Sequence, residues 1–126
     1  MHAPLTILLL MLLLQIKHMF ADFFLQTRTM LSGRDIYLHV GRAQHVAVHA
    51  LGTVMVFAAM GASLRAMVII VVGEAIAHYH IDYWKGRHTA ANGLTPEHGG
   101  YWRATGLDQA LHQLTYIAMI WAWLTF

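Results

Sequence analysis

The chain has 126 residues, a length typical of one domain. Hydrophobic residues make up 58% and charged residues only 11%, against about 45–50% and about 25% in ordinary soluble domains. A soluble protein this small needs more charge to cover its surface, so the apolar excess predicts contact with lipid. The chain has no cysteine, which excludes disulfides and thiolate metal sites, and its net charge of +2 is too small to indicate nucleic-acid binding.

Four apolar stretches, each close to the ~20 residues that cross a bilayer, predict transmembrane helices. They cover residues 5–26, 45–62, 64–84 and 107–126. Backbone polar groups in lipid must be satisfied within the segment, so each stretch is expected to be helical. The first is expected to be a retained span and not a signal peptide, because no Lys or Arg precedes it and no cleavage signal follows closely. The predicted fold is all-α: an antiparallel four-helix membrane bundle, one domain over residues 1–126, with both termini on one side.

Two polar connections, residues 27–44 and 85–106, lie on the same side of such a bundle. They carry most of the cationic residues of the chain, namely Arg28, Arg34, Arg42, Lys85, Arg87 and Arg103. The opposite side carries only Arg65. The positive-inside rule therefore predicts that both long connections are cytoplasmic and both termini outside.

Ionisable residues four apart recur on every predicted helix. Side chains at i and i+4 share one helix face, one turn apart, so four such faces can meet at a common axis. The pairs are His18 and Asp22, His45 and His49, His78 and Asp82, and Asp108 and His112, with Glu74 one turn deeper. Because the helices alternate in direction, all four pairs are expected within about two turns of the cytoplasmic interface.

These groups predict a metal site. An ionised residue at the centre of a transmembrane helix costs about 2.5–3.5 kcal/mol, so such residues must compensate one another. Imidazole and carboxylate groups are the usual ligands of divalent metals; we expect zinc first, with iron or manganese as alternatives. The predicted ligands are His18, His45, His49, His78, Asp82, Asp108 and His112. A metal-free His–Asp network or proton path stays open as an alternative, as do simple hydrogen bonds between helices.

The pattern favours a membrane-embedded, metal-dependent hydrolase that acts on an amphiphilic substrate at the cytoplasmic leaflet. Asp22 or Glu74 is the expected general base, and Lys85, Gln26 and Gln109 are expected to bind the substrate, Lys85 through an anionic headgroup. Two other functions stay open: transport of a divalent cation or protons, and a structural or regulatory role in which the polar core only fixes the bundle. The expected partners are the lipid bilayer and an amphiphilic or anionic small molecule, with a homo-oligomer as a further option.

Four short motifs follow one another along the chain. They are Lys17-His18-Met-Phe-Ala-Asp22-Phe-Phe-Leu-Gln26, His45-x-x-x-His49-Ala50, His78-x-x-Ile-Asp82-Tyr-x-Lys85 and Leu107-Asp108-Gln109-Ala-Leu-His112. In these residues and this order the sequence resembles the small bacterial and phage membrane proteins of the domain of unknown function 3307 family. The resemblance covers all four predicted spans. It implies that the residues selected by helical spacing are also the family's motif residues, and it implies no activity.

Overall fold

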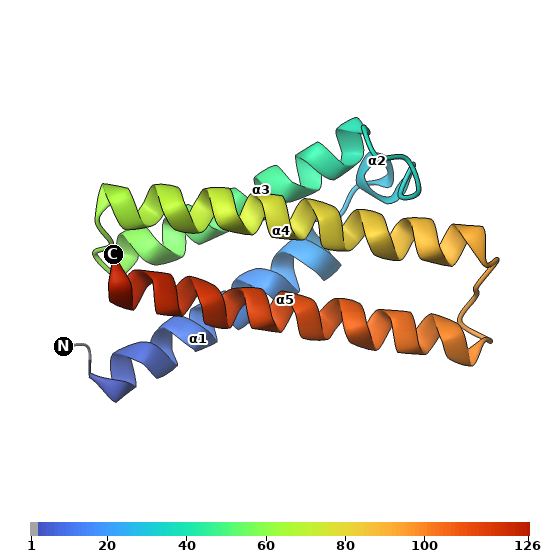
Figure 1. Cartoon of the computed structure of the whole chain (residues 1–126). Coiled ribbons are helices and arrows are strands. Elements are labelled where there is room, and N and C mark those ends of the chain that lie inside the picture. The colour runs from blue at the N-terminus through green and yellow to red at the C-terminus, as the bar shows by residue number, and fades with distance from the viewer. Residues whose placement is uncertain (1–2) are drawn as a thin grey trace.

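The computed structural model describes residues 3–126, and these are helical almost throughout, without a strand. The elements in chain order are α1 (Pro4–Met19), η1 (Phe20–Phe24, a π-helix that continues α1), α2 (Arg28–Leu31), α3 (Val40–Ala59), α4 (Leu64–Ala91) and α5 (Gly99–Thr125). The predicted all-α class is confirmed. Figure 1 shows α4 and α5 side by side, with α3 packed against α4 and α1 crossing the bundle at an angle.

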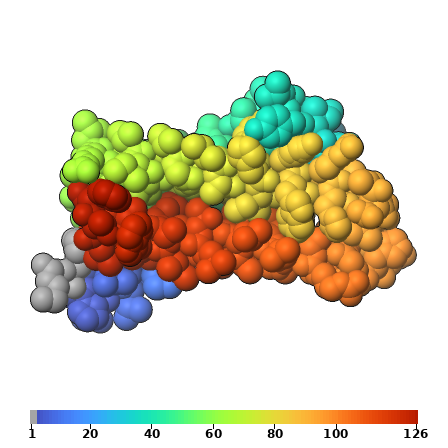
Figure 2. Space-filling model, in the orientation of Figure 1, coloured from blue at the N-terminus to red at the C-terminus, as the bar shows by residue number. Residues whose placement is uncertain are grey.

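Both ends of the described chain lie at one end of the bundle. The start of α1, the end of α5 and the α3–α4 turn are found there, while α2 and the α4–α5 turn lie towards the other end (Figure 1). Figure 2 shows the α4–α5 hairpin projecting beyond the other helices, with the segment around α2 packed on the α4 side. The bundle therefore has two unlike ends, one formed by tight turns and one by longer connections.

Local signals explain where the helices start and stop. Pro4 opens α1, where its missing N–H costs nothing. The Ser63 hydroxyl accepts a hydrogen bond from the Ala66 N–H at 3.1 Å, so Ser63 is the N-cap of α4. Gly61 and Gly93 have φ of 76° and 59°, so each supplies the left-handed residue that ends the preceding helix, α3 and α4 respectively.

The helices extend further than hydropathy predicts at the end with the long connections. α4 continues to Ala91 and α5 begins at Gly99, so most of the expected 85–106 connection is helical. Polar side chains lower hydropathy without breaking a helix, and the chain turns only where it meets Gly93 and Pro96. The expected 27–44 connection also contains α2 and the first turn of α3.

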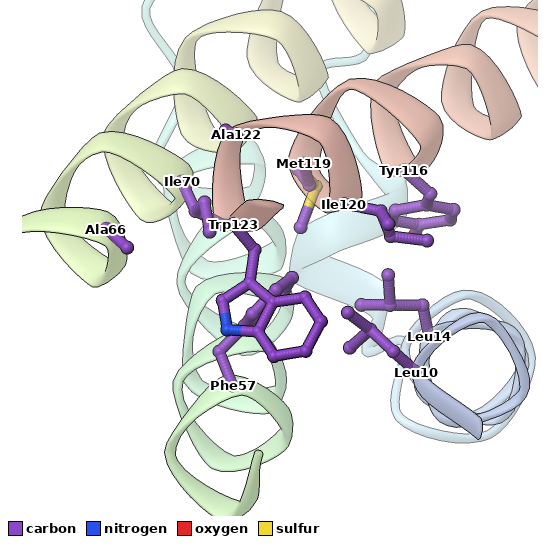
Figure 3. Close-up of a cluster of buried hydrophobic side chains, with 10 residues drawn as sticks. All are labelled: Leu10, Leu14, Phe57, Ala66, Ile70, Tyr116, Met119, Ile120, Ala122 and Trp123. Carbon is purple, nitrogen blue, oxygen red and sulfur yellow. The ribbon is translucent and has the colours of Figure 1, made fainter. Parts of the chain in front are cut away.

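The hydrophobic core occupies the half of the bundle near the tight turns. Figure 3 shows its side chains, which come from α1, α3, α4 and α5: Leu10, Leu14, Phe57, Ala66, Ile70, Tyr116, Met119, Ile120, Ala122 and Trp123. The buried ionisable residues lie in the other half, beyond Tyr116 and Leu14. The fold thus places an apolar plug at one end and a polar cluster at the other.

The outer surface is strongly apolar. Leu5, Leu8, Leu64, Val68 and Ile117 are each more than half exposed. Among the described residues, two helical segments are long and apolar enough to cross a bilayer, residues 4–24 and 64–91. This finding agrees with membrane association, but it supports only two of the four predicted spans.

Candidate metal centre

The end of α1 widens into the π-helix η1, which carries Asp22. The Leu25 N–H bonds the Phe20 carbonyl at 2.9 Å, an i to i+5 spacing. Such turns are rare and concentrate at functional sites. The Asp22 carboxylate lies inside a ring of imidazoles, 2.8 Å from His49 Nε2, 3.1 Å from His45 Nε2 and 3.2 Å from His18 Nε2.

Asp82 is the second carboxylate surrounded by imidazoles. It lies on α4, one turn after His78, and its Oδ2 is 3.0 Å from His78 Nε2. Its other oxygen is 3.5 Å from His112 Nε2 on α5, and Oδ2 is also 3.7 Å from His45 Nε2 on α3. The four i,i+4 pairs therefore converge from four segments at one level, as their spacing predicts.

The histidine rings are packed closely. The His49 and His78 ring centroids are 3.9 Å apart, and those of His78 and His112 are 4.3 Å apart. His45 lies 4.8 Å from His49 by the same measure. Protonated, positively charged imidazoles this close together would repel one another strongly. Several of these histidines must therefore be neutral, or bind a common cation in their neutral form. Neutral imidazole is the form that binds metals.

Two groups of side chains could hold a metal ion. The first consists of Asp22, His45, His49 and His78, and the second of His78, Asp82 and His112. Within each group, one ligand atom per residue lies within 4.8 Å of every other. In a tetrahedral zinc site with bonds of ~2.0–2.1 Å the ligand atoms are about 3.3 Å apart, so a small contraction would close either group on an ion.

Several polar atoms in the centre are buried without a hydrogen-bond partner among residues 3–126. They are His45 Nδ1, His49 Nδ1, His78 Nε2, His112 Nε2 and Asp108 Oδ1. His78 Nε2 and His112 Nε2 are near Asp82, yet neither is placed to make a hydrogen bond with it. Burying such atoms unsatisfied is costly, and a bound cation is one way to satisfy them.

The charges around the centre are unevenly compensated. Glu74 is paired with Lys17, and Asp108 with Lys85 at 3.3 Å. In the described part of the chain, the ion-pair partners of Asp22 and Asp82 are imidazoles alone. Two half-buried carboxylates without a permanent cation can be neutralised by two protonated imidazoles or by one divalent ion.

His18 stands outside both ligand groups, although its spacing predicts a ligand. Its Nδ1 is 2.8 Å from the Tyr116 hydroxyl, and its Nε2 lies 3.1 Å from Gln109 Oε1 and 3.2 Å from Asp22 Oδ2. With both ring nitrogens engaged in these contacts, His18 is placed to orient Asp22. Its role as a metal ligand stays a prediction.

Glu74, for which a base role stays a prediction, lies one turn deeper than the ligand groups. Both of its carboxylate oxygens are engaged, one by Lys17 and the other by the Thr53 hydroxyl, and the side chain is 1% exposed. Lys17 also donates to Thr53 Oγ1 at 3.0 Å. This buried ion pair forms the floor of the centre, on the side away from solvent.

A cavity of about 1010 Å³ opens from the centre towards the long connections. Asp22, His45, Asp82 and Asp108 form its inner end, and the predicted substrate-binding residues Lys85, Gln26 and Gln109 line it. Its walls also include apolar and aromatic side chains, namely Phe23, Met30, Leu94, Tyr101 and Trp102. A molecule with a polar head and an apolar body would find matching surfaces here.

Arg42 supports one wall of this cavity. Its guanidinium donates to the backbone carbonyls of Arg34, Ile36 and Tyr37, the last at 3.0 Å, and it lies against the rings of Tyr79 and Tyr83. Arg42 is 5% exposed. Its donors hold the chain between α2 and α3 in place. Arg34 is the freer cation: it donates to Gln26 Oε1 at 3.2 Å and is exposed.

The i,i+4 ladders continue one turn beyond the predicted residues. Thr53 follows His49 on α3, and Tyr116 follows His112 on α5; both contact the centre. Tyr116 is 3% exposed and lies inside the bundle. Extending the same spacing by one turn would have found both residues.

A family model described as "Protein of unknown function (DUF3307)" matches residues 8–126. The chain belongs to the DUF3307 family. The match includes every residue of the centre and of the cavity, so the resemblance drawn from the four motifs is confirmed. Searches of curated proteins and of solved structures give no match to the chain.

Proposed function

We propose that this DUF3307 protein is a four-span bundle of the bacterial inner membrane that binds a divalent metal ion and uses it to hydrolyse an amphiphilic substrate. The apolar outer surface and the two segments long enough to span a bilayer support insertion. α3 and α5 pack between or beside these segments with similar length and would supply the other two spans. By the positive-inside rule, the arginines near α2 support a cytoplasmic position for the cavity.

One observation carries the metal assignment. Asp22 and Asp82 are surrounded by imidazoles, and the only ionic partners that the described residues offer them are those rings. A divalent ion would neutralise both carboxylates and satisfy the nearby unpartnered nitrogens. Nitrogen and oxygen donors of this kind suit zinc, and also iron or manganese.

A bound divalent ion would supply Lewis acidity and activate water at neutral pH. The chain supplies the rest. Asp22 can bind the ion through Oδ1, which faces His45 and His49, and leaves Oδ2 towards His18 to accept a proton. Lys85 lines the cavity with a cation that can meet an anionic headgroup, and Gln26 and Gln109 add amides beside it.

Metal content of the detergent-purified protein tests the first step. The charge balance predicts about one divalent ion per chain. His49 and His112 belong to different groups, so His49→Ala and His112→Ala show which group holds the ion: the variant that removes a donor from that group is expected to lose it. His80→Ala is the matched control, since His80 lies on α4 but pairs with Tyr37 outside the centre at 2.8 Å. Folded wild-type protein without metal would contradict the proposal.

The same preparations test hydrolysis. Wild-type protein is assayed against esters and phosphoesters of amphiphiles, first as purified, then stripped with a chelator, then reloaded. Activity is expected to follow metal content through all three states. If the stripped protein stayed folded and kept its full hydrolytic rate, the metal would have no part in hydrolysis, although the protein could still bind it.

A further inference from the structure

Gln15 and Gln113 place an amide pair on the outer surface of the bundle. Gln15 Nε2 donates to Gln113 Oε1 at 2.6 Å and so joins α1 to α5. Gln15 is exposed, and Gln113 is half-buried. The bond uses one polar group of each amide. Gln15 Oε1, an acceptor, and Gln113 Nε2, a donor, have no further partner within residues 3–126.

This pair lies at a depth where the surrounding surface is apolar. Gln15 precedes the end of η1 by nine residues, which at 1.5 Å per residue puts it about 13 Å inside the bilayer in the proposed orientation. Leu12 and Ile117, one turn away along α1 and α5, are 55% and 54% exposed. Hydrocarbon offers no hydrogen bonds, so an amide group left unpaired at this depth is costly.

We propose that this surface is a homodimer contact. In a two-fold arrangement the free acceptor of Gln15 in one copy meets the free donor of Gln113 in the other, and the reciprocal bond forms at the same time. A second copy is favoured over an unlike partner because one copy already presents both complementary groups. Hydrogen bonds between polar side chains promote association of transmembrane helices. The contact depends on membrane insertion and not on metal binding or hydrolysis.

Cysteine cross-linking in membranes tests the contact, because the chain has no cysteine of its own. Leu12→Cys and Ile117→Cys each place a thiol one turn from the amide pair, on the proposed interface. Ile76→Cys is the control; it is 59% exposed on α4 and lies two residues from His78, at a similar depth. Oxidation is expected to give covalent dimers from the first two variants and monomers from the control.

The amides themselves are tested in the same background. Adding Gln15→Leu and Gln113→Leu to Leu12→Cys is expected to lower dimer yield by about tenfold, since two reciprocal bonds are lost. Helical circular dichroism of the purified variant serves as the readout of its folding. Cross-linking that persists at full yield with both amides replaced would overturn the proposal. So would a dimer that forms only through Ile76→Cys, or a folded monomer in every variant.

Discussion

Lys17 and Glu74 form an ion pair at the floor of the candidate metal centre, where the side chains are 5% and 1% exposed. Both come from apolar stretches of helix, and Gly52 leaves room for the Lys17 methylene chain to lie against α3. Neither charge has another counter-ion of opposite sign as near among the described residues. Each buried charge is stabilised by the other, so the ion pair links α1 to α4.

Removing the charge of one partner should destabilise the protein more than removing both charges. Glu74→Gln leaves the Lys17 ammonium buried, and we expect the free energy of unfolding to fall by about 3–5 kcal/mol. The double variant Lys17→Met/Glu74→Gln removes both charges and is expected to recover most of that loss. Denaturation of the three proteins in one detergent measures the difference. Equal losses in the single and double variants would show that the charges are not coupled.

Residue spacing predicted which side chains meet, but not what each one does. His18 and His49 have equivalent positions in their i,i+4 pairs, yet only His49 belongs to a ligand group. The difference depends on Tyr116 and Gln109, which engage both nitrogens of His18 from α5. Such contacts depend on how α1 packs against α5, and the helical periodicity of a single segment carries no information about that packing.

Gly86 governs how closely α4 approaches the segment that walls the cavity. A β-carbon at this position would collide with the carbonyl oxygen of Arg34. We expect Gly86→Ala to push the 32–37 segment away from α4 and to destabilise the protein by about 1–3 kcal/mol. Gly106→Ala on α5 is the matched control. A β-carbon there meets nothing within 4 Å, so the change should stabilise by about 0.5–1 kcal/mol through helix propensity.

Thermal unfolding of the two glycine variants beside the wild type measures these opposite shifts. A Gly86→Ala protein as stable as Gly106→Ala would mean that the segment is not held against α4 as described.

Hydropathy located the helices well and their ends poorly. The segment of α4 after Trp84 and the segment of α5 before Leu107 are polar. A hydropathy scale measures compatibility with lipid, so the spans that it predicts end at these residues. Helix formation depends instead on backbone propensity and on the positions of Gly and Pro, and Gly86 in α4 shows that a lone glycine does not end a helix. The extra turns build the outer walls of the cavity.

The division of the molecule into an apolar half and a polar half argues against a through-path. Below the Lys17–Glu74 pair, Leu10, Phe57 and Ile70 are 0–2% exposed and fill the space between the helices. An ion or a proton leaving the centre in that direction would meet no charged side chain of the core cluster. The geometry of one chain therefore favours a dead-end site over a transport path.

The orientation of the whole molecule can be measured by thiol labelling in intact cells. Glu97→Cys, in the exposed α4–α5 connection, is expected to be protected from a membrane-impermeant reagent because that end should face the cytoplasm. Ala62→Cys, in the α3–α4 turn, is expected to be labelled. The reverse labelling pattern would mean that the topology is opposite to the proposed one. Labelling of both thiols would contradict a membrane-spanning bundle.

The plug of apolar side chains between the centre and the tight turns has a consequence for metal supply. With that route closed within residues 3–126, an ion bound as proposed would enter and leave through the cavity, which faces the cell interior in the proposed topology. Occupancy would then follow the cytosolic concentration of the metal and be insensitive to its abundance outside the cell. A chelator confined to the periplasm would leave the bound ion in place, whereas one that enters the cell would compete for it.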